Sequence, residues 1–68
     1  MAIYDNVKLI ALKKGIGIPQ LEQSAGLSNG SIGKWNKVNP RVTSVKAVAD
    51  VLGVSVDTLL KDNLEVIG

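Results

Sequence analysis

Gly26-Leu27-Ser28-Asn29-Gly30-Ser31-Ile32-Gly33-Lys34-Trp35 is the stretch that decides the fold of this 68-residue chain. It predicts a tight turn followed by a short helix with a small, polar and cationic outer surface. Gly26 supplies a left-handed turn residue, and Ser28 is a favourable cap for a helix that runs to Trp35 or Asn36. Small side chains let a backbone approach bases closely, while Ser, Asn and Lys contact base edges or phosphates. The stretch therefore indicates an element that enters a groove of DNA.

The Asn29-Gly30 pair is also a strong signal for a two-residue hairpin turn, which would compete with this helix. Its flanks, Leu27-Ser28 and Ser31-Ile32, are too short and too polar to pair as strands. Leu27, Ile32 and Trp35, in contrast, lie within helical reach of one another. We therefore expect a helix, although each of its glycines costs about 1 kcal/mol relative to alanine.

Two helices are predicted upstream of this stretch. Apolar residues at helical spacing mark one at residues 3–14, and the following glycine ends it. The second covers about residues 18–25, with Gly17 as a weak cap and Pro19 in the first turn, where the missing N–H of proline costs little. Gln20 is placed to reach back toward that cap.

Two more helices are predicted downstream, after a loop marked by Asn39-Pro40. Thr43 or Ser44 caps the first of them, which carries a regular apolar stripe and ends at Gly53. Ser55 caps the second, which is short.

Length and composition limit the chain to one small domain with a marginal core. Hydrophobic residues make up 46% of the sequence and aromatic residues only 3%, so the core must consist of aliphatic side chains around Trp35. The expected fold class is all-α, a compact five-helix bundle. The domain is expected to cover residues 1–61, and residues 62–68 a tail or the start of a linker or dimerisation segment.

The sequence contains no cysteine and no histidine. The commonest zinc ligands, general bases and activated nucleophiles are therefore missing. We expect no enzymatic activity, no metal or other cofactor, and no small-molecule ligand. No apolar run approaches the roughly 20 residues of a membrane span, and no export signal is evident. A soluble, cytoplasmic protein without a membrane partner is expected.

Charge is unevenly distributed along the chain, whose net charge is +2. Residues 23–49 contain no acidic residue, and their basic residues are Lys34, Lys37, Arg41 and Lys46. A few lysines usually indicate only a solvated face. Their coincidence with the predicted turn and helix favours a DNA-binding surface instead.

Together these features resemble the Cro/cI-type helix-turn-helix family, also called the XRE family, over residues 3–61. Within the motif the resemblance rests on Leu21, Gly26-Leu27-Ser28, Ile32 and Trp35. Downstream it is supported by Val48-Ala49 and by the run Leu52-Gly53-Val54-Ser55-Val56-Asp57-Thr58-Leu59-Leu60. The chain is most similar to small repressor domains of low-GC Gram-positive bacteria and their phages. The resemblance implies a lambda-repressor-like bundle with the helix-turn-helix motif at about residues 18–36.

The resemblance also implies a function: sequence-specific binding of double-stranded DNA by a transcriptional regulator, expected to be a repressor. A homodimer would read a palindromic operator, with the helix at residues 29–36 in the major groove. The base-reading residues would be Asn29, Gly30, Ser31, Gly33 and Lys34. The phosphate contacts would come from Gln20, Ser28, Asn36, Lys37, Asn39 and Arg41.

Two positions depart from the family pattern. A serine or threonine cap followed by glutamine is usual at the start of the second helix, where this chain has Gly17 and Ile18. That change removes a phosphate clamp unless Gln20 substitutes for it. Gly33 stands where serine is common, which predicts a looser reading helix and lower sequence selectivity.

Three large apolar residues belong either to the core or to an interface with a partner. Trp35 is expected to anchor the core, because its helical phase with Ile32 points inward. Leu9 and Leu12 fall off the inward stripe of the first helix. Either they join the apolar end of the tail in a homodimer interface, or they belong to a locally buried helix beside a loose tail. The alternative function is a helical protein-interaction module that uses this apolar surface without reading DNA.

Overall fold

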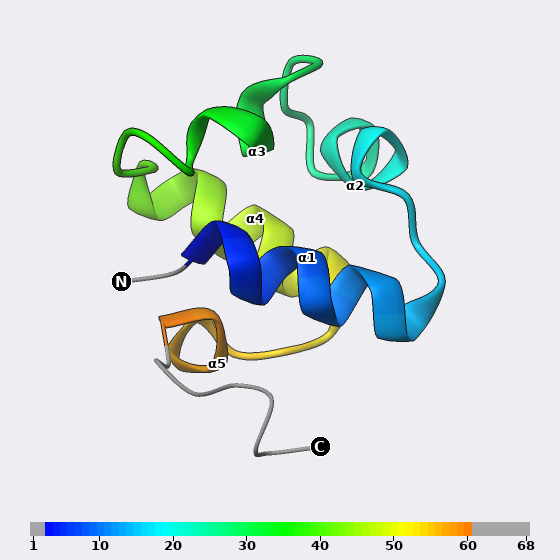
Figure 1. Ribbon diagram of the computed structural model, residues 1–68. Coiled ribbons are helices and arrows are strands. Elements are labelled where there is room, and N and C mark those ends of the chain that lie inside the picture. Colours follow the sequence, from blue (N-terminus) through cyan, green and yellow to red (C-terminus); the bar gives the residue numbers. More distant parts are fainter. Residues whose placement is uncertain (1–2, 61–68) are drawn as a thin grey trace.

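The computed structural model describes residues 3–60, which form five α-helices and no strand (Figure 1). The helices are α1 (Ile3–Lys14), α2 (Ile18–Ser24), α3 (Ser31–Lys34), α4 (Val42–Leu52) and α5 (Val56–Leu60). The predicted all-α class and the five helices are confirmed for this part of the chain. The predicted tail at residues 62–68 lies outside it.

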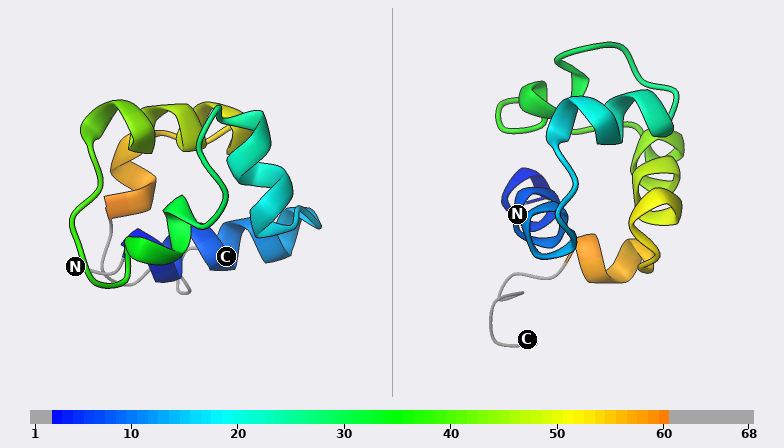
Figure 2. Two further views of the ribbon diagram at one scale, coloured as in Figure 1. Left: turned by 90° about the horizontal axis from the view of Figure 1, so that it is seen from above. Right: turned by 90° about the vertical axis from the view of Figure 1, so that its right-hand side faces the viewer.

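The helices surround a single core. In the right-hand view of Figure 2, α1 and α4 lie on opposite sides, α2 and α3 cover one end, and α5 closes the other. α2 packs against α1, α3 and α4, while α5 packs against α1 and α4. The central position of α2 means that α3 is attached to the bundle mainly through it.

Each helix contributes at least one completely buried aliphatic side chain to this core. These side chains are Val7, Leu21, Ile32, Val48, Leu52 and Leu59, each at most 1% exposed. Trp35 is partly buried and packs against the cluster. Trp35 therefore covers the edge of the core, and the predicted central anchor is replaced by aliphatic packing.

Two helix ends in the second half of the chain follow the sequence prediction. α4 ends at Gly53, whose φ of +71° is left-handed and whose N–H donates to the carbonyl of Asp50 at 3.2 Å. The Oγ of Ser55 accepts the N–H of Thr58 at 3.2 Å, so Ser55 caps α5 as expected.

The predicted cap of α4 is wrong. α4 begins at Val42, and Arg41 occupies the N-cap position without a side-chain cap, so neither Thr43 nor Ser44 has that role. The reason lies in the backbone: Arg41 is already extended, and its carbonyl accepts the N–H of Val45 at 3.0 Å. The first turn therefore closes before either hydroxyl residue reaches the cap position.

A buried polar contact joins the first helix to the last. Asn6 is only 4% exposed, and its Nδ2 donates to the carbonyl oxygen of Leu59 at 2.7 Å. This bond satisfies the Leu59 carbonyl, one of the last carbonyls of α5. It fixes α5 against α1.

Candidate functional site

The candidate site is built on α2, the turn after it, and α3. Pro19 lies in the first turn of α2, as expected, and Gly17 is the N-cap. No side chain caps this helix, so the prediction that Gln20 reaches back to the cap is wrong. The side chain of Gln20 is exposed. α2 ends at Ser24, one residue earlier than predicted, and Gly26 follows with a left-handed φ of +75°.

α3 begins later than predicted. Gly30 has a φ of +91°, which lies outside the helical region, so the helix starts at Ser31 and Asn29 belongs to the turn. Ser28 is not the cap of this helix. Its Oγ lies 2.8 Å from the Oγ of Ser31, and the two hydroxyls satisfy each other in place of a backbone N–H.

The end of α3 merges into a series of tighter turns. The N–H of Trp35 donates to the carbonyl of Ile32 at 3.0 Å, and that of Lys37 donates to Lys34 at 3.0 Å. These are i→i+3 bonds, as in a 3₁₀-helix. The predicted rod at residues 29–36 is therefore one α-helical turn, Ser31–Lys34, extended by tight turns to residue 37.

Glu22 supplies the cap that Ser28 does not. Its carboxylate is 2% exposed; Oε1 accepts the N–H of Gly30 at 3.0 Å, and Oε2 accepts that of Ile32 at 2.9 Å. No local motif in the sequence indicated this role for Glu22. The available signal was its spacing, because residue 22 falls on the inward stripe formed by Ile18, Leu21 and Ala25.

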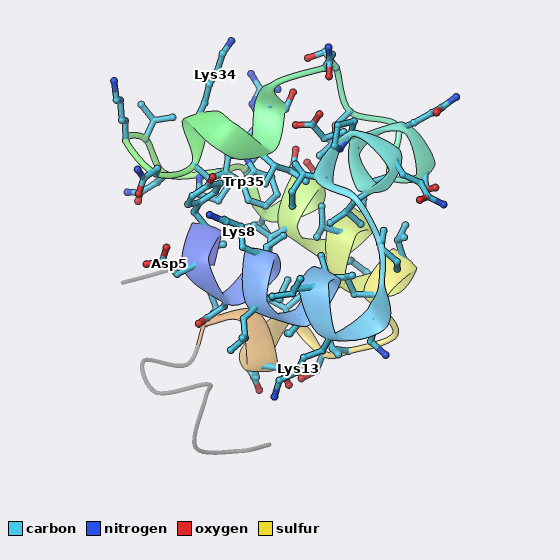
Figure 3. All side chains as sticks on the ribbon, turned by 45° about the vertical axis from the view of Figure 1, so that its right-hand side comes forward. Asp5, Lys8, Lys13, Lys34 and Trp35 are labelled. Atoms are coloured by element: carbon cyan, nitrogen blue, oxygen red, sulfur yellow. The ribbon has the colours of Figure 1, made fainter. Side chains whose placement is uncertain are left out.

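The predicted base-reading residues lie on one continuous, accessible segment. Asn29, Gly30, Gly33 and Lys34 are exposed, and Ser31 is half-buried. Lys34 points away from the helices below it, whereas Trp35 lies on the side of α3 that faces them (Figure 3). The segment thus presents small polar groups and one cation to the outside.

The predicted phosphate-binding residues are all exposed. They are Gln20, Ser28, Asn36, Lys37, Asn39 and Arg41. Gln20 comes from α2, and the others flank α3 on both sides. A shallow hollow of about 440 Å³ between α3 and the start of α4 is lined in part by Lys34, Trp35 and Arg41. The structure thereby brings Lys34 and Arg41 to the lining of one depression.

This region carries almost no exposed negative charge. From residue 18 to residue 49 the only acidic residue is Glu22, and its carboxylate is buried. Lys46 is the basic residue of this segment that has an acidic neighbour, with its Nζ 3.9 Å from Asp50 in an exposed i,i+4 pair. Lys34, Lys37 and Arg41 remain available to an anionic partner.

Two further lysines, Lys8 and Lys13, come from α1. The Nζ of Lys8 lies 5.3 Å from the centre of the Tyr4 ring, within the range of a cation–π contact. Lys13 lies at the opposite side of the molecule from Lys34 (Figure 3).

An apolar surface occupies a different part of the molecule. Leu12 is 77% exposed, and it lines a groove of about 470 Å³ with Leu9, Ile16 and Ile18. Leu9 is half-buried and packs against the core. The two leucines therefore divide: Leu9 has a structural role, whereas most of the side chain of Leu12 faces solvent.

Within residues 3–60, no three His, Cys, Asp or Glu side chains are grouped so that they could hold a metal ion. None of the described helices is long and apolar enough to cross a membrane.

Comparison with known proteins gave no match: no family model, no curated protein and no solved structure corresponds to this chain. The function must therefore be argued from the residues and their geometry.

Proposed function

We propose that the protein binds double-stranded DNA sequence-specifically and acts as a transcriptional regulator, a repressor, of the lambda-repressor-like helix-turn-helix type. One observation carries the proposal. The surface of α2, its turn and α3 presents small polar side chains and Lys34 outward, is flanked by Lys37 and Arg41, and buries the acidic residue of the segment. A polyanion with readable base edges is the partner that such a surface fits.

In this proposal residues 29–34 face the bases and the residues around them hold phosphates. Asn29 pairs with adenine and Lys34 with guanine, while the lack of side chains at Gly30 and Gly33 admits thymine methyl groups. A homodimer places two such segments about one helical turn apart on a palindromic operator.

Selection of bound sites from a pool of random duplexes tests the proposal most directly. We expect a palindromic consensus, because each subunit of a two-fold dimer reads one half-site. A pool that yields no enriched sequence would contradict the proposal. Half-sites in direct repeat would contradict the symmetric dimer.

A matched pair of lysine variants separates base reading from phosphate binding. Lys34→Ala should weaken binding to the selected duplex by about 1–3 kcal/mol and relax preference at one base pair. Lys37→Ala should weaken binding to all sequences alike. Titrations of the selected duplex and of a scrambled one measure both effects, and equal losses on both duplexes for both variants would contradict these roles.

The groove beside Leu12 favours a second candidate, a helical protein-interaction module that does not read DNA. Salt dependence distinguishes the two. A DNA-bound dimer with about six phosphate contacts should show a log–log salt slope near −5, whereas association through an apolar groove should be nearly insensitive to salt.

A further inference from the structure

Glu22 is an ionisable side chain placed in the interior of the bundle. It belongs to α2, yet both of its carboxylate oxygens accept N–H groups from the start of α3, those of Gly30 at 3.0 Å and Ile32 at 2.9 Å. At 2% exposure the carboxylate cannot itself contact DNA.

A buried carboxylate is costly unless other groups compensate for the water that it loses. Glu22 has no cationic partner: among the described residues the recorded ion pair is Lys46 with Asp50. Its compensation comes from charge-assisted hydrogen bonds to the two backbone N–H groups. An apolar side chain would fill this place on the inward stripe without that cost, but it could not accept the N–H groups of Gly30 and Ile32.

α3 depends on this contact for its orientation. It has only four residues, no side chain of its own caps it, and Gly30 before it has a left-handed backbone. One helical turn is too short to be stable alone. Its attachments include the buried Ile32, the partly buried Trp35 at its C-terminal end, its packing against α2, and the two bonds to Glu22.

We propose that Glu22 is a positioning residue that sets the orientation of the segment 29–34 relative to α2, and thereby controls discrimination between DNA sequences. The inference rests on the proposed function. Base-edge hydrogen bonds require donors and acceptors to be placed accurately, whereas attraction between lysines and phosphates tolerates displacement. Loss of the carboxylate should therefore reduce selectivity and leave the general attraction for DNA unchanged.

The test compares Glu22→Gln with Asp5→Asn. Both change a carboxylate into a carboxamide of nearly the same size, but Asp5 is exposed on α1, away from α3 (Figure 3). In Glu22→Gln one N–H of the α3 start faces an NH₂ group, so one of the two bonds is lost. Each protein is titrated with the selected duplex and with a scrambled duplex of equal length, and thermal unfolding is recorded in parallel.

In Glu22→Gln the ratio of the two affinities should fall about tenfold, while affinity for the scrambled duplex stays within a factor of two. Asp5→Asn should behave as the parent. A folded Glu22→Gln protein with an unchanged ratio, or with equal losses on both duplexes, would overturn the inference. So would failure of this variant to fold at low temperature, because Glu22 would then support the whole bundle.

Amide hydrogen exchange in the parent gives a second readout that needs no variant. The amides of Gly30 and Ile32 should exchange more slowly than that of Asn29, and equal rates at all three positions would also overturn the inference. If the parent itself enriches no sequence, the proposed function fails. If it enriches one and Glu22→Gln retains full discrimination, only the role of Glu22 fails.

Discussion

Gly30 and Gly33 lie in one short segment, but the backbone requires glycine at only one of the two positions. Gly30 has a φ of +91°, a conformation in which an L side chain is strained. Gly33 has ordinary helical geometry, and an added Cβ would meet no atom within 4 Å. The fold therefore requires glycine at position 30 but not at position 33, where an open surface is left for a partner.

Replacing each glycine by alanine should change stability in opposite directions. Gly30→Ala should lower the free energy of unfolding by about 1–2 kcal/mol, because the left-handed backbone is strained. Gly33→Ala should raise it by up to about 1 kcal/mol through helix propensity. Thermal denaturation resolves both, since 1 kcal/mol corresponds to a shift of about 4–8 °C in a domain of this size. Shifts of the same sign would contradict the assignment.

At the scale of elements, the glycine stops and the starts of α1, α2 and α5 were predictable from the sequence, whereas the starts of α3 and α4 were not. Gly53 ends α4 as expected, because a left-handed glycine acts locally. The start of α3 depends on a hydrogen bond from Gly30 to Glu22, which lies eight residues earlier in the sequence. The residues next to Gly30 give no sign of this contact. The residues near a helix end therefore indicate a cap from the same segment, but they do not indicate a cap from another helix.

Two buried polar residues within residues 3–60 make contacts between helices that the sequence did not predict. Asn6 and Glu22 lie on the inward stripes of α1 and α2, at positions where apolar residues are expected. Each hydrogen-bonds to another element, Asn6 to α5 and Glu22 to the start of α3. A polar residue in an apolar phase was the signal, but its partner could only be identified in three dimensions.

The local cap on α5 gives a prediction at this scale. Ser55→Ala removes the acceptor of the Thr58 N–H and should lower the free energy of unfolding by about 1 kcal/mol. Ser24→Ala, at an exposed serine on α2, is the matched control and should have little effect. Urea denaturation of both variants measures the difference, and equal midpoints would show that the Ser55 bond adds nothing.

At the scale of the whole molecule, the proposed DNA-reading surface and the apolar groove are made by different parts of the bundle. The reading segment is centred on α3, whereas the groove lies between the second half of α1 and the start of α2. None of residues 29–34 lines the groove. The exposed Leu12 is the side chain on which a dimer interface in the groove depends most.

A pair of lysine substitutions tests whether the groove beside Leu12 is a dimer interface. Leu12 and Val42 are 77% and 76% exposed, so Leu12→Lys and Val42→Lys impose the same change on the folded domain at two different surfaces. Both variants should remain folded, and only Leu12→Lys should weaken self-association in sedimentation at high concentration. Equal association of both variants and the parent, or a monomeric parent, would rule out this face as the dimer interface.

The hydrogen bond between Asn6 and Leu59 spans 53 positions of the chain. During synthesis at about 5–20 residues per second, roughly 3–10 s pass between the appearance of the amide and that of its acceptor. Throughout that interval the apolar side of α1 has no α5 to cover it. A chain that stops before α5 therefore lacks part of the cover of α1 and the buried acceptor of the Asn6 amide.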